Sequence, residues 1–187
     1  MEDAVDRLHE AVKLYVTDVT RQELDREESL RANEIMTFAT NLEHIGDIAE
    51  NVMDLARKKK KKHLTFSEVG LSELTDLHTR VADNLKLALS IFMSGDVRLA
   101  RKLLQEKRTV IAMERAAAED HMSRLRDGRR DSIETSALHM DILRDLKRIH
   151  SHVVAVVYPV LVRAGELDAL PKRGNKKGVS RIAADQI

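Results

Sequence analysis

The sequence predicts an all-α fold, an antiparallel helical bundle of five long helices. Hydrophobic residues make up 43% of the 187 residues and aromatic residues only 3%, so the core must be built from Leu, Val, Ile, Ala and Met. Charged residues reach 34%, which beside such a core is typical of long amphipathic helices. With 2 Pro and 7 Gly, the chain has too few turn residues for an all-β sandwich or a glycine-rich nucleotide-binding loop.

Two helices are expected in the first third of the chain, at 2–19 and at about 25–59. Each has an apolar face at helical spacing. The first face is Val5, Leu8, Val12 and Val16, and the second is Ile35, Phe38, Leu42, Ile45, Ala49, Val52 and Leu55. The segment Thr20-Arg21-Gln22-Glu23 between the helices is expected to form a capping box. The basic run from Arg57 to Lys62 ends the second helix, where cations favour the helix dipole.

Three more helices are expected, from the segment 65–68 to about 94, at about 97–126, and from about 131 to 164. Asp96 is a good N-cap for the fourth helix, and Asp127-Gly128 should end it. Pro159 is expected to kink or end the fifth helix, because proline has no backbone N–H and its ring crowds the preceding turn. The short, polar and basic tail at 168–187 is expected to be disordered.

The chain contains an internal repeat. A shift of 104 residues places Leu42 on Leu146 and Ile45 on Ile149, so the first two helices echo the fourth and fifth. The third helix has no counterpart before the first. We therefore expect a tandem of three-helix units that lacks its first helix, with one unit at 1–62 and the other at 63–167. The apolar face of the first helix, near Val5, Leu8, Val12 and Val16, should then be bare and favour a homo-oligomer.

Four carboxylates form a stripe on one face of the second helix, at Glu43, Asp47, Glu50 and Asp54. Gly46 lies within this stripe, although Gly in a helix interior costs about 1 kcal/mol relative to Ala. A helix with repelling acids and a glycine is expected to have a packing or binding reason for them. The spacing by itself also fits a solvated helix face, because such pairs are common in a chain this charged.

A second acidic stripe, Glu2, Asp6 and Glu10, lies on the first helix, which should run antiparallel to the second. Two acidic faces meeting across a groove would repel each other unless a cation bridged them. Carboxylate oxygens suit hard cations such as Mg²⁺, Ca²⁺, Mn²⁺ or iron. The candidate metal ligands are Glu43, Asp47, Glu2, Asp6 and Glu50.

Other function classes find little support. The chain has no Cys, no P-loop, no dinucleotide fingerprint and no nucleophile elbow, so it is not expected to be an enzyme. A net charge of +1 and the absence of aromatics interleaved with the basic run argue against nucleic acid. The run from Arg57 to Lys62 fits a solvated helix end or contact with an anionic membrane surface. No apolar run approaches the roughly 18 residues of a membrane span, and the chain is expected to be cytoplasmic.

Several separated strings resemble one family. The segment Phe38-Ala39-Thr40-Asn41-Leu42-Glu43-His44-Ile45-Gly46-Asp47 resembles the signature of PhoU-like proteins, the phosphate-uptake regulators. The resemblance is closest to the PhoU-like C-terminal domain of bacterial sodium/phosphate cotransporters, and it spans nearly all of residues 2–167. The further matching strings are Ser94-Gly95-Asp96, Ser132-Ile133-Glu134-Thr135-Ser136, Asp145-Leu146-Lys147-Arg148-Ile149 and Tyr158-Pro159.

The resemblance implies a tandem of two three-helix bundles and a metal-binding Glu/Asp-x-x-x-Asp motif. Glu43 and Asp47 match this motif, and Glu2 with Asp6 are candidates for its partner. In the second half four other residues replace the acidic stripe, so a single metal site is expected, in the first half. These replacements are Lys147 for Glu43, Ser151 for Asp47, Val154 for Glu50 and Tyr158 for Asp54.

The functional expectation that follows is a non-enzymatic regulatory domain of phosphate transport. It would lie at the inner face of the cell membrane, in contact with the membrane domain of a transporter. In the cotransporters a membrane domain precedes this region, so the chain is expected to be a fragment or a remnant of such a protein. Two alternatives remain: a free-standing PhoU-type regulator of phosphate-uptake signalling, and a structural or oligomerisation bundle without a ligand.

Overall fold

The computed structural model describes residues 2–167, with side chains from residue 4 onward. This part of the chain is all-helical and contains no strand, which confirms the expected fold class. The helices are α1 (Glu2–Val19), α2 (Arg26–Lys61), α3 (Glu68–Ser94), α4 (Val97–Arg126), α5 (Arg130–Val154) and the short α6 (Val157–Arg163). The tail expected to be disordered, at 168–187, lies outside the described residues.

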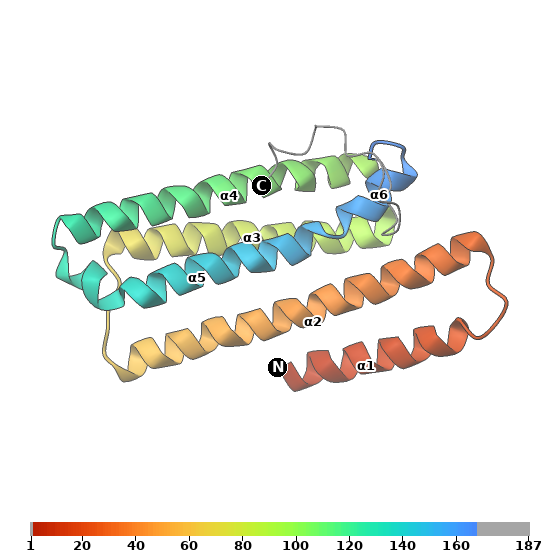
Figure 1. Cartoon of the computed structure of the whole chain (residues 1–187), viewed down its shortest axis with the longest axis horizontal. Helices are drawn as coiled ribbons and strands as arrows, with labels where there is room; N and C mark the ends of the chain where they lie inside the picture. The colour runs from red at the N-terminus through yellow and green to blue at the C-terminus, as the bar shows by residue number, and fades with distance from the viewer. Residues whose placement is uncertain (1, 168–187) are drawn as a thin grey trace, which may run out of the picture.

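The helices form two groups (Figure 1). Helices α3, α4 and α5 pack on one another as a three-helix bundle, and α6 packs on α4. Helix α2 lies along α5, and α1 runs antiparallel to α2 on the side away from the bundle. The boundary expected at 62/63 falls in the loop between α2 and α3. The division into two units remains a prediction.

The dense core lies within the α3–α5 bundle. Leu77, Ile91, Leu103 and Leu143 are at most 1% exposed there, and Ile48 of α2 closes one side. Helix α1 contributes only one buried apolar residue among those described, Val16. The apolar residues of the bundle therefore hold the fold together, and α1 is attached through α2.

The face of α1 that was expected to be bare is mostly covered. Val16 is buried, and Val5 and Val12 are half-buried, because this valine stripe is the face that packs on α2. Leu8 alone of the four is exposed. The large apolar residues that α1 does leave exposed are Leu8, Leu14 and Tyr15.

The start of α2 also differs from the expectation. The capping box forms at Asp25 and Glu28 rather than in the segment 20–23: Glu28 N donates to Asp25 Oδ1 at 2.8 Å, and Asp25 N donates to Glu28 Oε2 at 2.9 Å. This pair satisfies backbone donors at the true first turn. At its other end α2 runs to Lys61, so most of the basic run is helical.

Pro159 interrupts the last helix one turn before its own position. Its nitrogen cannot donate to the carbonyl of Ala155, and its ring crowds that carbonyl. Helix α5 ends at Val154, and α6 begins at Val157; Ala155 and Val156 between them form a turn, although their backbone dihedrals stay in the right-handed helical region. The expected interruption is therefore found, and the segment after it, α6, packs on α4.

Candidate metal site

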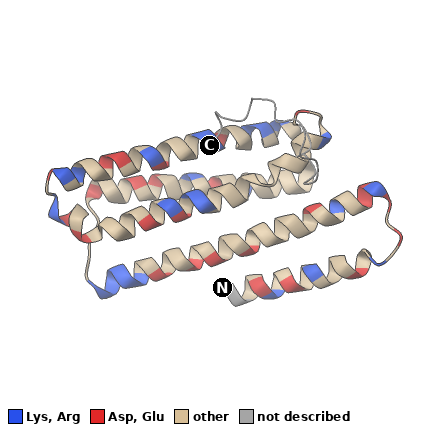
Figure 2. Ribbon diagram, viewed as in Figure 1, with Lys and Arg blue, Asp and Glu red and all other residues tan. Residues whose placement is uncertain are grey.

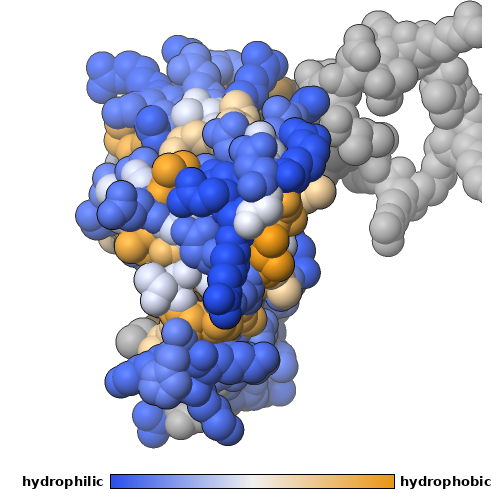
Figure 3. Space-filling view, turned by 90° about the vertical axis from the view of Figure 1, so that its left-hand side faces the viewer, coloured by the Kyte–Doolittle hydropathy of each residue, from blue (hydrophilic) through white to orange (hydrophobic). Residues whose placement is uncertain are grey.

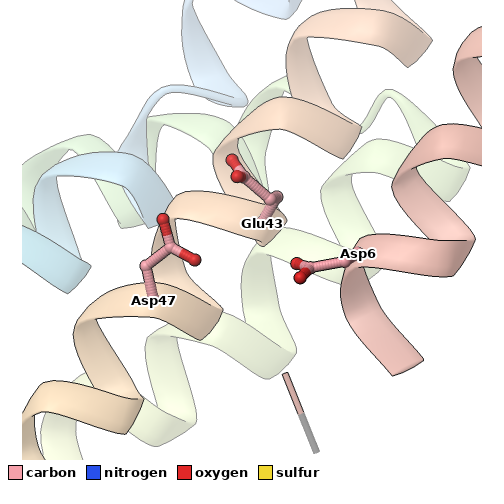
Figure 4. Close-up of side chains that lie close together, drawn as sticks. All are labelled: Asp6, Glu43 and Asp47. Carbon is pink, nitrogen blue, oxygen red and sulfur yellow. The ribbon is translucent and has the colours of Figure 1, made fainter. Parts of the chain in front are cut away.

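Three acidic side chains from two helices converge at the surface between α1 and α2. One carboxylate oxygen from each of Asp6, Glu43 and Asp47 lies within 4.8 Å of the others. Figure 4 shows Asp6 reaching from α1 toward α2, which carries Glu43 and Asp47 one turn apart. Three ionised carboxylates this close repel one another, and an oxygen-binding cation would relieve that repulsion.

Beside these acids, α1 and α2 contact each other through a glycine and through a pair of polar side chains. A Cβ built on Gly46 would lie 3.5 Å from Val5 Cγ1, so the two helices are in van der Waals contact beside the acids. One turn along, Thr40 Oγ1 and His9 Nε2 lie 3.4 Å apart. Val5 and His9 flank Asp6 on α1 and hold its carboxylate beside α2.

A pair of histidines lies on the other side of Glu43. His44 Nε2 is 3.5 Å from Glu43 Oε2, and the His44 ring meets the His152 ring of α5 edge to face, with centroids 5.1 Å apart. His152 Nδ1 is 2.8 Å from Asn41 Oδ1. Burial, followed by the nearby charge of His44, lowers the pKa of His152. The acidic group therefore borders the contact between α2 and the bundle.

Not all of the expected ligands meet. Glu50 is not part of the three-residue group, because the antiparallel register that places Val5 on Gly46 puts Glu50 opposite the very start of α1. Asp54 pairs instead with Arg57, at 2.7 Å. The side chain of Glu2 lies outside the described residues.

The arrangement has the donors of a cation site. The donor set is three carboxylates at the surface, which fits a hard cation completed by water. Among the described residues this is the one group of three or more acidic or histidine side chains close enough to share an ion. None of the helices described between residues 2 and 167 is long and apolar enough to cross a membrane.

Comparison with known proteins identifies the family. The model of the PhoU domain matches residues 1–56 and 74–159 of the chain. This chain belongs to the PhoU domain family. Its structure is similar to the crystal structure of PhoU from Pseudomonas aeruginosa, with a TM-score of 0.78 and 23% identity over 87% of this chain and 78% of that one. The expected resemblance to the family is thus confirmed, and the likeness to that structure supports the fold.

The relatives of this PhoU domain are longer proteins. It is 41% identical over 162 residues to a Salmonella typhimurium protein named "Putative inorganic phosphate export protein YjbB". It is 38% identical over 167 residues to the Escherichia coli (strain K12) protein of the same name. These matches cover 86% and 89% of this chain, but only 30% and 31% of the relatives. A Thermotoga maritima protein named "Phosphate-specific transport system accessory protein PhoU homolog 1" is 28% identical over 118 residues, 63% of this chain and 50% of that protein.

The second half of this PhoU domain carries no matching acidic group among the described residues. Lys147, which stands where Glu43 stands, forms an ion pair with Glu114 at 2.8 Å. Ser151, which stands where Asp47 stands, donates to the carbonyl of Lys147 at 3.1 Å. A lysine paired with a carboxylate replaces the two neighbouring acids, so this face offers no pair of free carboxylates to a cation.

The sequence patterns do not indicate a buried polar cluster that lies near the start of α3 and the end of α4. Arg124 Nη1 and Nη2 each donate to a Glu73 carboxylate oxygen at 2.7 Å, and His139 Nε2 is 3.3 Å from the same carboxylate. His139 Nδ1 lies 3.1 Å from His121 Nδ1, and His121 Nε2 is 2.9 Å from Ser136 Oγ. The cluster ties α3, α4 and α5 together. Two of its members, His121 of α4 and His139 of α5, are 1% exposed.

Proposed function

We propose that this PhoU domain is a non-enzymatic regulatory or accessory domain of phosphate transport that acts on the membrane domain of a phosphate transporter of the sodium/phosphate cotransporter kind. The observation that carries the proposal is the 41% identity to a relative whose name states inorganic phosphate export. The chain spans about 30% of that relative's length, so the relative has room for a membrane domain beyond the matching segment.

A domain exchange tests the proposed role. In the Salmonella typhimurium relative, this chain replaces the 162 residues that match it, and export of radiolabelled phosphate from loaded cells is measured. The relative without the segment and the intact relative set the two reference rates. We expect the exchanged protein to export phosphate at the rate of the intact relative. A rate equal to that of the relative lacking the segment would contradict the proposal.

The proposed effector of the domain is a divalent cation or iron held by Asp6, Glu43 and Asp47. Since one ligand lies on α1 and two on α2, occupancy would fix the distance between these helices. Cation binding thereby couples ion availability to the shape of the face that α1 and α2 present. A ligand-free structural bundle is the competing interpretation. Unfolding midpoints that are identical in Mn²⁺ and in chelator would favour it.

The exposed apolar side of α1 supports a further contact in the assembled protein. Leu8, Leu14 and Tyr15 are 65%, 62% and 71% exposed, and α1 packs closely on α2 alone. A second copy of the chain, as a homo-oligomer, would cover this side. Light scattering at high concentration tests it, and a folded species that stays monomeric would count against the homo-oligomer.

A second candidate function is a free-standing PhoU-type regulator. The match to half of the Thermotoga maritima accessory protein favours it, because that relative is named as a component of a phosphate-specific transport system. The same export assay separates the two functions. A transporter domain requires covalent fusion or stable association, whereas a free-standing regulator alters phosphate transport when it is expressed as a separate chain.

A further inference from the structure

Three separate segments lie at one end of the molecule, at the left of Figure 1. They are the end of α2 with its following loop, the start of α3, and the turn between α4 and α5. Two ring contacts join the first segments to α5: Lys59 Nζ lies 5.2 Å from the centroid of the Phe66 ring, and that ring lies 6.0 Å from the His139 ring. The ion pair between Arg124 and Glu73 joins the end of α4 to α3. We name this end of the molecule the basic end.

The basic end carries a net positive charge, whereas the rest of the chain is net negative. Nine exposed or half-exposed cations gather there against five acids, in a chain whose net charge is +1, so the remainder of the molecule is net negative. Figure 2 shows the blue segments at this end. The cations are Arg57, Lys58, Lys59, Lys60, Lys61, Lys62, Arg126, Arg129 and Arg130, and the acids are Asp54, Glu68, Asp127, Asp131 and Glu134.

Several of these cations have no protein partner. Arg57, Arg129 and Arg130 form ion pairs with acids on their own segments. Within the described part of the chain, no ion pair is formed by Lys58, Lys60, Lys61 or Lys62. Lys58 and Lys62 are like charges four residues apart on one helix face and repel each other, so an external anionic surface would stabilise this helix end.

Exposed apolar side chains accompany these charges. Val69 and Leu71 in the first turn of α3 are 55% and 54% exposed, and Ile133 in the first turn of α5 is 52% exposed. Cα–Cβ bonds tilt toward the N-terminus of a helix, so first-turn side chains lean off this end. Seen from this side, Figure 3 shows apolar residues between the hydrophilic ones.

We propose that the basic end is a docking surface for an anionic membrane. Lysines beside short apolar side chains suit a lipid interface, where the charges meet headgroups and the apolar groups enter the boundary below them. Nucleic acid is a poorer match, because stacking needs exposed aromatics, and the aromatic residue of this end, Phe66, is half-buried beneath Lys59. The inference does not rest on the proposed role in phosphate transport.

The test is sedimentation of the full chain with vesicles of phosphatidylcholine alone or with 30% phosphatidylglycerol. Each lysine at a surface of this kind changes partitioning by roughly fivefold. The variant Lys58→Gln/Lys60→Gln/Lys61→Gln should therefore bind anionic vesicles at least tenfold more weakly. The matched control, Lys86→Gln/Arg98→Gln/Lys102→Gln, removes the same charge at the opposite end and should bind within twofold of the unaltered chain.

A second pair of variants tests the apolar contribution. Leu71→Ser/Ile133→Ser should weaken binding severalfold, whereas Leu89→Ser/Met93→Ser, exposed residues near the other end of α3, should leave it unchanged. The proposal is overturned by equal losses in the lysine variant and its control, by equal binding to both vesicle types, or by no binding at low salt. Tighter, lysine-dependent binding to single-stranded RNA than to vesicles of matched charge would also overturn it, in favour of nucleic acid.

Discussion

Val5 of α1 lies directly against Gly46 of α2, with 3.5 Å between Val5 Cγ1 and the place where a Cβ would stand on Gly46. That spacing is ordinary van der Waals contact, so a methyl group fits without moving α1. Gly46 sits in the middle of a helix of 36 residues, where it weakens the helix. The contact matters because Asp6, next to Val5, is the ligand that α1 supplies to the candidate metal site.

Replacing Gly46 by Ala should stabilise the protein. The change removes the conformational cost of a helical glycine without a clash, so the free energy of unfolding should rise by about 1 kcal/mol. Chemical denaturation followed by circular dichroism measures it. A decrease in stability would mean that α1 and α2 approach more closely than 3.5 Å at this contact.

Gly46→Leu should have the opposite effect. The larger side chain must displace Val5 and with it the start of α1, moving Asp6 away from Glu43 and Asp47. Mn²⁺ affinity should fall for the leucine variant and persist for the alanine variant, as titration calorimetry can show. Equal Mn²⁺ affinities in the two variants would show that Asp6 is not a ligand of the site.

The buried ion pair between Glu73 and Arg124 should be costly to break from either side. Both side chains are nearly buried, at 14% and 10% exposed, and Arg124 reaches both carboxylate oxygens. Glu73→Ala should lower the free energy of unfolding by about 3 kcal/mol, because it leaves an unpaired buried cation. The double variant Glu73→Leu/Arg124→Met should be less destabilised than Glu73→Ala. A single variant within 0.5 kcal/mol of the unaltered protein, roughly the effect of an ordinary surface substitution, would contradict this assignment.

Stability should fall on acidification because two histidines are buried in their neutral form. Burial, aided by the charges of His121 and Arg124, lowers the pKa of His139 to about 4. Burial also lowers the pKa of His150 to about 4, with Glu106 opposing and Lys107 reinforcing the shift. Above pH 6.5, the ordinary pKa of a histidine, neither the folded nor the unfolded state takes up the proton. Between 6.5 and 4 only the unfolded chain does, so each histidine removes about 1.4 kcal/mol per pH unit there.

The pH dependence can be divided between the histidines. His150→Gln keeps a polar atom near Asn84, whose Nδ2 is 2.9 Å from His150 Nε2. Because it removes one of the two histidines, the free energy of unfolding should fall by about 1.4 kcal/mol less per pH unit between pH 6.5 and 4. Thr135→Val removes a buried hydroxyl that donates to Asp131 O at 2.7 Å, without removing a titratable group. It should lower the stability by the same amount at every pH. Identical slopes for His150→Gln and the unaltered protein would contradict the assignment of His150.

The sequence predicts helix bounds most accurately where local capping and turn residues set them. The bounds of α1 and α4 agree with the expectation, and α4 is framed by the Asp96 N-cap and by the turn at Asp127-Gly128. The capping box of α2 was misplaced because the segment 20–28 holds more than one polar residue followed by Glu three positions later. In the structure the box forms at the later of these positions, Asp25 and Glu28.

The candidate site was predictable in part, for a geometric reason. Periodicity puts Glu43 and Asp47 on one face, but which residue of α1 meets them depends on the antiparallel register, which the Val5–Gly46 contact sets. That register includes Asp6 and leaves out Glu50. The cluster of Glu73, Arg124 and His139 could not be foreseen, since its members come from three helices and share no local pattern.

The most direct test of a cation site between α1 and α2 is calorimetric titration of the chain with Mn²⁺. We expect saturable binding that is abolished in Glu43→Ala/Asp47→Ala. Binding should be retained in Glu50→Ala/Asp54→Ala, which removes the same charge at the same spacing further along α2. Equal heats for the unaltered chain and both variants would contradict the site.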